Sequence, residues 1–598
     1  MSVWTDFRDK IASRKITLFE IDVPELHTFF LPEEAGIWML KIRDYRKGVS
    51  GSFKTGAFCF GNFKGAFTSQ NLGWNDAAKI VGSVMVDQEA YTEAASLADC
   101  RSTEKSFYYA GDTTLYIHFE DWNPPHVFQR IELGIVNGFA TQDSWQADVF
   151  YEGRIKATPT ITKSKDPLYF GLIRYGGGTV ELLNNDGHFD ALIQNNIFGQ
   201  PCRIKFGGDD LTYAQYYTVF TGFVEDYKID STRFRVRITD ERKKLARNLP
   251  VNAFDDTTYP DIKPRNVGKS IPMAYGEITN APVICTNEEE STPANYAFKI
   301  VDTTYHSIKE ITQVYVEGEE KTHSNESLAN ATFTLSTSDY SPGDTVTVDF
   351  KGYDDSVGKD GSGTLIDNPL DIIEDLFLNH LDITYGASEF NTSEWATAKA
   401  AVYNVALWIK DRKSIIDLIE NMSLSVFGNF IVQGDGLYTF RLTDNSAASS
   451  KTILRDEQLT EPSAEYDSTE FLSSVIVKYD KDQDSGDYIE YPDTSRESDV
   501  HDNYKTYREK EFETLLKDAA DAATLASAIL DEMESIRPVF PVVTKTHVID
   551  LEIMDNVTVQ IDRKSSAWYG NNKCEVVGIS IDLDANRVQL ECKYIEAA

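Results

Sequence analysis

The stretch YKIDSTRFRVRI, residues 227–238, is the most informative about the fold, because a distant stretch of the same chain has the same pattern. Residues 581–592 read IDLDANRVQLEC. In each, a short polar turn follows an apolar strand end and precedes a strand in which apolar and polar residues alternate. The residues that align in the two turns are Asp230 with Asp584 and Arg233 with Arg587. The pattern predicts two β-hairpins.

Two interpretations of this internal likeness stay open. Any two hairpins can look alike over twelve residues, so the match can be a coincidence. Alternatively, the chain holds two related β-barrels, one around each hairpin. Three copies of such a chain would place six similar barrels around one axis by closed cyclic symmetry. A three-fold oligomer would then present a nearly six-fold ring.

The composition favours a mainly β, multidomain protein with a minor share of helix. The chain has 598 residues, of which 41% are hydrophobic and 12% aromatic. At about 100–200 residues per domain, three to five domains are expected, and the aromatic content favours strands. The predicted units are an aromatic-rich N-terminal β domain (1–150), a first barrel (151–250), an inserted β domain (251–365), a helix-hairpin domain (366–454) and a second barrel with a long helix (455–598).

Local patterns predict the elements inside these units. Strands are expected at 168–173, 178–183, 202–206, 216–224 and 234–238 in the first barrel, and at 546–551, 556–561, 573–583 and 587–594 in the second. One helix begins after Asn368 or Asp367 with Pro369 in its first turn, and another is capped by Asp411. A hairpin joins 429–433 to 437–442. We also expect a helix near 87–97, an exposed loop at 480–503 and a long helix at 509–536.

The charge and the cysteines exclude several functions. There are 58 Lys and Arg residues against 95 Asp and Glu residues, a net charge of −37. Such a chain would repel DNA or RNA rather than bind it. The acidic surface can serve solubility alone, or it can line a conduit through which nucleic acid passes without binding. The six Cys form no CxxC pair, so neither a zinc site nor a disulfide scaffold is expected. The N-terminus shows no signal-peptide pattern, and no apolar stretch is long enough to cross a membrane.

The chain resembles bacteriophage tail and baseplate hub proteins. The resemblance lies in an N-x-DG-x-FD turn, an F-x-G-x-V strand, a D-x-x-x-x-L ending, a helix-plus-hairpin module and a closing barrel. It covers roughly residues 160–598 and does not include 1–150. The stretches that carry it are 178–190 (GTVELLNNDGHFD), 200–206 (QPCRIKF), 219–224 (VFTGFV), 234–245 (FRVRITDERKKL), 270–280 (SIPMAYGEITN), 409–442 and 539–594.

This resemblance implies a homotrimeric structural hub with two tail-tube-like barrels per chain. Such a hub adapts the hexameric tail tube to the central tip and closes the DNA channel. The implied partners are the tail tube or distal tail protein, the tape measure protein and a central fibre or spike. The implied location is the tail tip of the virion, after assembly in the host cytoplasm. Because no fibre-forming C-terminus, coiled coil or lysin-like insertion is present, a separate tip protein would be needed.

No catalytic or cofactor motif emerges, so the prediction is a non-enzyme without metal or cofactor. His118, Asp121 and His126 are too irregularly placed for a metal site, and His188 lies in a turn that lacks most ligands of a calcium loop. Gly268-Lys269-Ser270 lacks the earlier glycine of a phosphate loop. The acidic pairs and triplets, Asp354 with Asp355 and Glu288 to Glu290, are expected to be solvated.

Two further functions are alternatives. The N-terminal domain holds five of the eight Trp, and exposed aromatic rings such as those of Trp74 and Trp122 could bind host surface glycan, which would make the chain a tail-tip adhesin. Core or subunit packing is the structural alternative for the same residues. Hydrolysis of a cell-wall polymer is the other alternative, because paired carboxylates are common in so acidic a chain.

Overall fold

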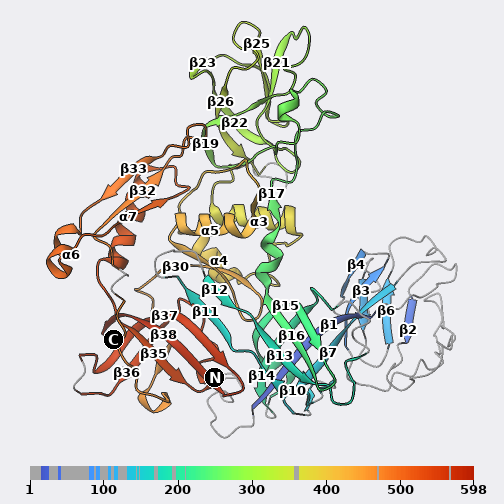
Figure 1. Ribbon diagram of the computed structural model, residues 1–598, viewed down its shortest axis with the longest axis vertical. Coiled ribbons are helices and arrows are strands. Elements are labelled where there is room, and N and C mark those ends of the chain that lie inside the picture. Colours follow the sequence, from blue (N-terminus) through green and yellow to red (C-terminus); the bar gives the residue numbers. More distant parts are fainter. Residues whose placement is uncertain are drawn as a thin grey trace.

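The computed structural model describes most of the chain beyond residue 130 and separate strands before it. The chain is mainly β with a minor share of helix, and it is divided into several sheets, as predicted. Figure 1 shows the inserted β domain at the top, the helices in the middle and two curved sheets below. The described residues are 15–25, 38–41, 80–86, 89–93, 106–109, 114–118, 131–142, 144–146, 149–151, 153–166, 173–190, 197–208, 211–355, 363–467, 471–564 and 567–597.

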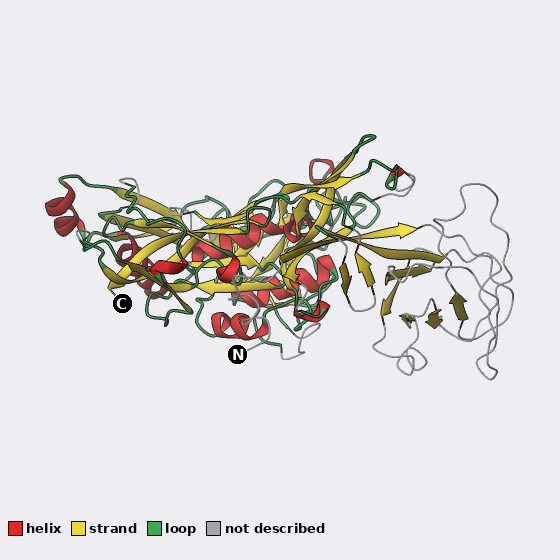
Figure 2. Ribbon diagram, turned by 90° about the horizontal axis from the view of Figure 1, so that it is seen from below, coloured by secondary structure: helices red, strands yellow, loops and turns green. Residues whose placement is uncertain are grey.

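Twelve strands form the first sheet, in the order β10-β13-β16-β15-β14-β1-β7-β3-β4-β5-β6-β2. Strands β2 to β6 lie to one side of the molecule in both views (Figures 1 and 2). The bounds are β1 Lys15–Glu25, β2 Trp38–Lys41, β3 Ile80–Val86, β4 Glu89–Glu93, β5 Ser106–Tyr109, β6 Thr114–His118, β7 Ile131–Ala140, β10 Ile155–Ala157, β13 Gly178–Leu183, β14 Pro201–Gly208, β15 Tyr217–Ile229 and β16 Arg233–Asp240. The small β8–β9 pair joins Ser144–Gln146 to Val149–Tyr151.

The first sheet curves because its longest described strand changes partners. The first half of β15 pairs with β14 and the second half with β16, and the register shifts between Val224 and Asp226. Such a bulge bends a strand and increases its twist. Gly222 lies where the pairings with β14 and β16 overlap, and a Cβ there would come within 2.1 Å of the Thr239 carbonyl oxygen. The predicted strands 178–183, 202–206, 216–224 and 234–238 are all present, with small differences at their ends.

Seven strands form the second sheet. The long strand β37 pairs with β38 along one edge, while its other edge is shared between β36 and β11. The bounds are β11 Ile161–Lys165, β12 Ile173–Gly176, β31 Lys451–Ile453, β35 Val539–Thr544, β36 Asn556–Ile561, β37 Gly570–Asp582 and β38 Arg587–Ala597. Residues 546–551, which we predicted as a strand, instead contain a 3-10 turn at Thr546–Val548. Of the strand predicted at 168–173, only Ile173 lies within the described part of the chain, and it is the first residue of β12.

A segment that we call the strap, residues 451–465, nearly closes the second sheet into a barrel. Its first part is β31, which pairs in parallel with β36. Its last part runs beside β35, where the Leu459 amide donates to the Val543 carbonyl (2.7 Å) and Glu465 and Val539 exchange two hydrogen bonds of 2.9 Å. Because β35 also pairs with β38, backbone contacts lead from β36 through β37, β38, β35 and the strap back to β36. Barrels remove the exposed edges that open sheets leave.

The pairing of strands crosses two of the predicted domain boundaries. Strand β1 lies between β14 and β7, so the N-terminal strands continue the first sheet. Hairpin β11–β12 belongs to the predicted first barrel by sequence but pairs with β37 of the second sheet. The predicted units are therefore connected by shared sheets, and their exact division stays a proposal.

One contiguous hydrophobic cluster lies against both large sheets. We keep the predicted names first barrel for strands β10, β13, β14, β15 and β16 and second barrel for the second sheet, although among the described strands the pairings lead round to closure only in the second sheet. The cluster contains the inward-facing residues of β16 (Phe234, Val236) and of β38 (Val588, Leu590), each at most 1% exposed. Residues Ile161 and Ile173 of the β11–β12 hairpin belong to the same cluster. Because burial of apolar surface is the main favourable contribution to folding, the two barrels share their principal source of stability.

The inserted β domain consists of two four-stranded sheets. The first has the order β19-β26-β22-β23 and the second β20-β21-β25-β24. Aromatic rings pack between strands of the second sheet, where Phe298 and Phe333 stack at 5.2 Å. The bounds are β19 Glu277–Pro282, β20 Ile284–Cys285, β21 Asn295–Lys299, β22 Ile308–Val316, β23 Glu319–Lys321, β24 Ser324–Ser327, β25 Thr332–Ser336 and β26 Val346–Tyr353.

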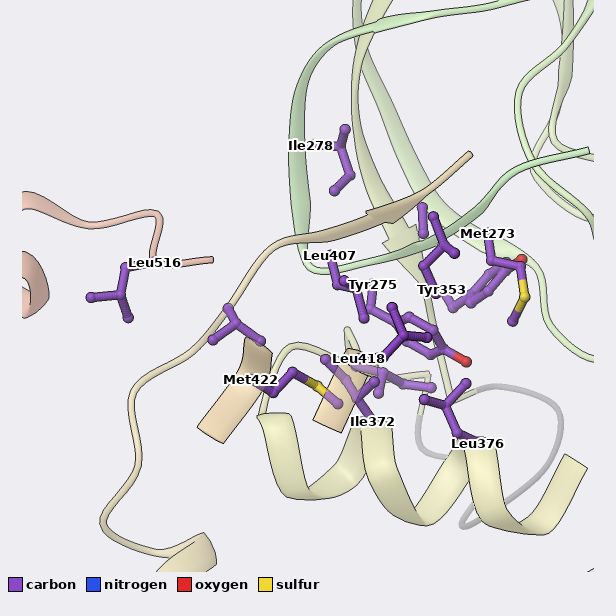
Figure 3. Close-up of a cluster of buried hydrophobic side chains, with 14 of the residues drawn as sticks. Met273, Tyr275, Ile278, Tyr353, Ile372, Leu376, Leu407, Leu418, Met422 and Leu516 are labelled. Atoms are coloured by element: carbon purple, nitrogen blue, oxygen red, sulfur yellow. The ribbon is translucent and has the colours of Figure 1, made fainter. Parts of the chain in front are cut away.

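The helices of the middle layer connect this domain to the rest of the chain. Asn368 caps α3 and Pro369 occupies its first turn, as predicted. Ser414 rather than Asp411 caps α5, because Lys413 and Ser414 first form a strand with Asn248 and Leu249. Figure 3 shows side chains of both helices packed with Tyr275 and Tyr353. The bounds are α3 Pro369–Leu381, α4 Thr392–Lys399, α5 Ile415–Ser425, β17 Asn248–Leu249, β18 Met273–Tyr275, β27 Leu407–Ile409, β28 Lys413–Ser414, β29 Gly428–Val432 and β30 Tyr438–Leu442.

Three further sequence predictions about local structure are wrong. Residues 89–93, expected in a helix, form strand β4. The expected loop at 480–503 contains strand β33 and most of helix α6, and the expected helix at 509–536 is divided into strand β34 and helix α7. Strand β34 pairs with β32, so sheet contacts outweigh the helical composition there. The bounds are β32 Ser474–Tyr479, β33 Ile489–Asp493, α6 Glu497–Tyr504, β34 Glu509–Glu513 and α7 Ala519–Met533.

Candidate interaction site at the junction of the two barrels

The first aligned hairpin, β15–β16, is closed by its own turn residues. Asp230 Oδ1 accepts the backbone N–H groups of Thr232 and Arg233, both at 2.9 Å. These hydrogen bonds, first of all the one from Thr232, hold the pKa of Asp230 below its usual range. Arg233 extends to Glu181 of the neighbouring strand at 3.2 Å. Both predicted residues therefore support the turn in which they lie.

The second aligned hairpin, β37–β38, uses its residues differently. Asp582 accepts the Ala585 amide at 2.9 Å and lies 3.5 Å from Arg587, so it supports the turn. Asp584 instead contacts another part of the chain, where it accepts the Thr158 amide (2.9 Å) and hydroxyl (2.8 Å). Thr158 follows β10 of the first barrel. Asp584 thus joins the hairpin of the second barrel to the first barrel, a role that Asp230 does not share.

A buried ion pair lies where the two barrels meet. Lys163 of β11 donates to both carboxylate oxygens of Glu552, at 2.9 and 2.7 Å, and both residues are under 10% exposed. Glu552 also accepts the Gly434 amide at 3.1 Å, and the Lys163 ammonium lies 3.3 Å from the Val432 carbonyl oxygen. Buried pairs add little net stability compared with apolar residues, but they penalise arrangements that leave one charge alone. This pair therefore fixes how three segments meet.

The tip of the β29–β30 hairpin packs against the first barrel beside this ion pair. Thr221 of β15 donates its hydroxyl to the Gly434 carbonyl at 3.1 Å. A Cβ on Gly434 would lie 2.7 Å from the Val219 carbonyl oxygen, so only glycine fits. The Val432 amide donates to the Tyr175 hydroxyl at 2.8 Å, and the Arg242 guanidinium lies 4.1 Å from the Tyr175 ring centre. Burial raises the pKa of Tyr175, which keeps its hydroxyl neutral.

A second group of charges connects the helical layer to the second barrel. Arg441 of β30 binds both carboxylate oxygens of Glu394 at 2.8 Å and also Asp555 at 2.8 Å. Burial raises the pKa of Glu394, but the hydrogen bonds from Arg441 outweigh it, and the net pKa is below the usual value. Lys165 of β11 binds Glu575 at 2.8 Å in a more buried setting. The junction is therefore made of paired charges whose partners lie far apart in sequence.

The residues of this junction were not predicted from the sequence. The local sequence does not distinguish three of these residues from charged residues on the surface of a strand or loop: Lys163, Glu552 and Arg441. Gly434 lies in a Gly-Asp-Gly turn that predicts the hairpin but not its contact with β15. No signal in a single sequence pairs Lys163 with Glu552, since their distance along the chain is 389 residues.

The NNDGHFD turn is held by contacts inside the protein. Asp186 forms two hydrogen bonds with Arg154, at 2.9 and 2.7 Å, and these lower its pKa. Asn184 accepts the Phe189 amide at 2.9 Å. The His188 ring lies edge-on to Phe189, with 4.8 Å between the ring centres. The turn interpretation of this stretch fits these contacts.

Other sequence candidates lie outside the described part of the chain. Trp74, Trp122, Asp121 and His126 are not among the described residues, and His118 ends β6 without a described side chain. Within the described residues, no three His, Cys, Asp or Glu side chains gather as metal ligands would. In the same residues, helices of the length and apolarity that a bilayer crossing requires are absent.

The acidic residues expected to be solvated are partly buried. Asp354 and Asp355 are under 10% exposed. Asp354 accepts the Ser307 hydroxyl at 3.0 Å. Glu288 is also buried and pairs with Lys263 at 2.7 Å, whereas Glu289 and Glu290 are exposed. The prediction of solvation is therefore wrong for three of these five carboxylates, each of which has polar partners in the fold.

Comparison with known proteins gives distant structural likenesses. No family model matches the chain, and no curated protein sequence does either. The tail protein from Neisseria meningitidis MC58 is 11% identical, with 74% of this chain and 94% of that chain covered and a TM-score of 0.35. The 43 kDa tail protein of prophage MuSo2 from Shewanella oneidensis is 13% identical, with 75% and 95% covered and a TM-score of 0.35. A chain of the native gene transfer agent virion is 11% identical, with 55% and 85% covered and a TM-score of 0.38. The chain is thus similar, at low identity, to proteins of phage tails and related particles.

Proposed function

We propose that this chain is a structural hub of a bacteriophage tail tip or baseplate, and that it acts as a homotrimer. The observation that carries the proposal is the pair of curved sheets that share one core, each with a long bulged strand and a closing hairpin. A chain with two such units can place six barrels around a three-fold axis. This arrangement would match a hexameric tube on one side and a three-fold tip on the other.

The junction supports a mechanical role. Its buried pairs and the tightly packed hairpin tip fix the angle between the barrels, because a shifted arrangement would leave charges such as Lys163 unpaired. A part that transmits force between a tube and a tip needs such a fixed angle. The net charge of −37 favours a lumen that DNA passes without binding.

The proposed partners follow from this position. The tail tube or distal tail protein and the tape measure protein would contact the barrel ring, and a central fibre or spike would continue it. The chain would assemble in the host cytoplasm and remain in the virion. The proposed role needs no catalysis, and a zymogram on host cell wall tests that part, since clearance by the purified chain would contradict it.

The trimer is tested by measuring the mass of the purified full chain in solution. Mass photometry at low and high salt is expected to show a species of three times the 67.3 kDa chain mass. Obligate interfaces bury about 2,000 Å² or more and are largely apolar, so high salt should not dissolve them. A chain that stays monomeric in both buffers, also after mixing with its tail tube protein, would contradict the proposal. Virions labelled with an antibody against the chain should carry the label at the tail tip in electron micrographs.

A further inference from the structure

A cavity of about 700 Å³ lies between the inserted β domain and the segment from Trp408 to Arg412. Its walls come from the loop before β18 (Arg265, Lys269), from strands β20 and β21, and from the segment that follows β27. Cavities that bind small molecules commonly measure about 300–1,000 Å³. The size therefore suits a ligand of one or two sugar rings.

The charge of this cavity differs from the charge of the whole chain. Five cationic side chains line it against three acidic ones, although acidic residues greatly outnumber basic ones overall. Two of the acidic groups already have partners: Glu288 pairs with Lys263 at 2.7 Å, and Asp344 accepts the Ser341 amide at 2.8 Å. The third, Asp411, is exposed, so one acidic group stands against the cations that remain available. The five cationic residues are Arg265, Lys269, Lys299, Lys410 and Arg412.

Three of these cations remain available to a ligand. Arg265, Lys410 and Arg412 are exposed, and within the described part of the chain none of them forms an ion pair or a side-chain hydrogen bond. Lys269 and Lys299 are engaged, since Lys269 donates to Asn266 at 2.8 Å and Lys299 donates to the Asn330 carbonyl at 2.6 Å. Arginine binds carboxylate and phosphate groups through two parallel hydrogen bonds. The available cations therefore favour an anionic ligand.

Aromatic residues form the rest of the lining. Phe254, Phe298 and Tyr340 are buried, and Trp408 is half-buried. The Trp408 indole N–H is buried and has no acceptor among the described residues. An aromatic ring offers an apolar face to the C–H groups of a sugar, and the indole N–H can donate to a hydroxyl or carboxylate oxygen. An acidic peptide is less suited, because extended peptides use grooves or sheet edges where their backbone can pair.

We propose that this cavity binds an anionic saccharide, whose carboxylate or phosphate group contacts Arg265, Lys410 and Arg412 and whose ring packs against Trp408. The site lies between the inserted domain and the end of β27 with the residues after it, so it is separate from residues 1–150. It would give the chain a binding function that does not depend on the proposed role in a tail.

The binding test uses the full chain and calorimetric titration with disaccharides. A disaccharide with one uronic acid and a phosphorylated disaccharide are compared with a neutral disaccharide of the same linkage. At least one anionic probe is expected to bind ten or more times as tightly as the neutral one, and added salt should weaken its binding. Equal affinity for neutral and anionic probes, or no binding at millimolar concentration, would overturn the proposal. If a tetrapeptide that contains Asp and Glu binds as tightly as the anionic disaccharides, or more tightly, the proposal that the ligand is a saccharide is wrong.

Matched variants locate the site. Lys410→Gln with Arg412→Gln is expected to weaken binding of the anionic disaccharide at least tenfold. The control, Lys228→Gln with Arg237→Gln, removes the same charges from exposed positions on the first barrel and should change binding less than twofold. Trp408→Phe should weaken the binding of both the anionic and the neutral disaccharides. Thermal unfolding of each variant verifies that it is folded. Equal effects of the cavity pair and the control pair would contradict this location.

Discussion

At the scale of single residues, the Lys163–Glu552 pair gives the most direct test of the junction. Lys163→Met leaves Glu552 buried without its cation and is expected to lower the free energy of unfolding by about 3–5 kcal/mol. The double variant Lys163→Met with Glu552→Leu should recover much of this loss, because no single charge remains buried. The free energies come from denaturant unfolding of the two single variants and the double variant, which together form a double-mutant cycle.

An independent ion pair with an exposed carboxylate serves as the control for this cycle. Lys321 and Glu319 lie 3.0 Å apart on β23, and the Glu319 side chain is 78% exposed. Lys321→Met should change stability by no more than about 1 kcal/mol. If the losses from the two single variants at the junction simply add in the double variant, Lys163 and Glu552 do not interact as the structure indicates.

His380 predicts a pH dependence of stability. It is buried beside Tyr305, and neither ring nitrogen has a hydrogen-bond partner in the described part of the chain. Burial, helped by the charge of Arg247, lowers the pKa of His380 below 6.5, while Asp375 and Asp302 oppose this shift. The unfolded chain therefore takes up a proton near pH 6.5 that the folded chain does not. Stability falls as the pH drops below about 6.5.

The measurement for His380 is the free energy of unfolding at pH 7.5 and pH 5.5. The variant His380→Phe keeps an aromatic ring next to Tyr305 and should lose less stability between these two pH values than the unaltered chain. Carboxylates such as Asp186, whose pKa values are lowered, affect stability only at more acidic pH. If the variant loses as much free energy of unfolding between pH 7.5 and pH 5.5 as the unaltered chain, His380 does not cause the pH dependence.

Residue roles were the least predictable part of the molecule. The sequence shows that Asp354 and Glu288 are charged, and a charged residue is most often exposed. Their burial depends on Ser307 and Lys263, which only the tertiary fold brings near. Asp584 is a similar case, because its partner Thr158 is 426 residues away. Such long-range partners cannot be inferred from one sequence.

At the scale of elements, strands and turns were predicted well where a local pattern determines them. Strand β13 has the predicted bounds, 178–183, and the cap of α3 lies at Asn368. The two aligned hairpins both form, but their turns differ. Ile229 pairs with Phe234 in the first, whereas Asp582 pairs with Arg587 in the second. The registers thus differ by two residues, which keeps the same side chains facing inward because strands alternate with period two.

The hairpin β29–β30 gives a prediction at this scale. Gly434→Ala would place a methyl group 2.7 Å from the Val219 carbonyl oxygen. The hairpin tip must then move away from β15, and we expect a loss of about 1–3 kcal/mol in the free energy of unfolding. Thermal or denaturant unfolding measures this loss. Gly386→Ala is the matched control, because a Cβ at Gly386 meets nothing within 4 Å. Equal effects of the two substitutions would contradict the close packing of the tip.

At the scale of the whole molecule, the shared core predicts that the two barrels unfold together. Leu590 of β38 is fully buried in the cluster that also contains Phe234 and Val236 of β16. Leu590→Ala should cost about 2–5 kcal/mol. Native-state hydrogen exchange measures the free energy of opening for each slow-exchanging amide. If one core supports both barrels, this free energy should fall for the amides of β16 by as much as Leu590→Ala lowers the free energy of unfolding.

The inserted domain provides the control for this whole-molecule prediction. Phe333 is fully buried in the other large cluster, which contains the inserted domain and the helices. Phe333→Ala removes a comparable apolar side chain and should leave the protection of β16 amides nearly unchanged. Loss of β16 protection with Phe333→Ala, or none with Leu590→Ala, would mean that the barrels are independent units. A ring of rigid two-barrel subunits would then be excluded, because each barrel could open without the other.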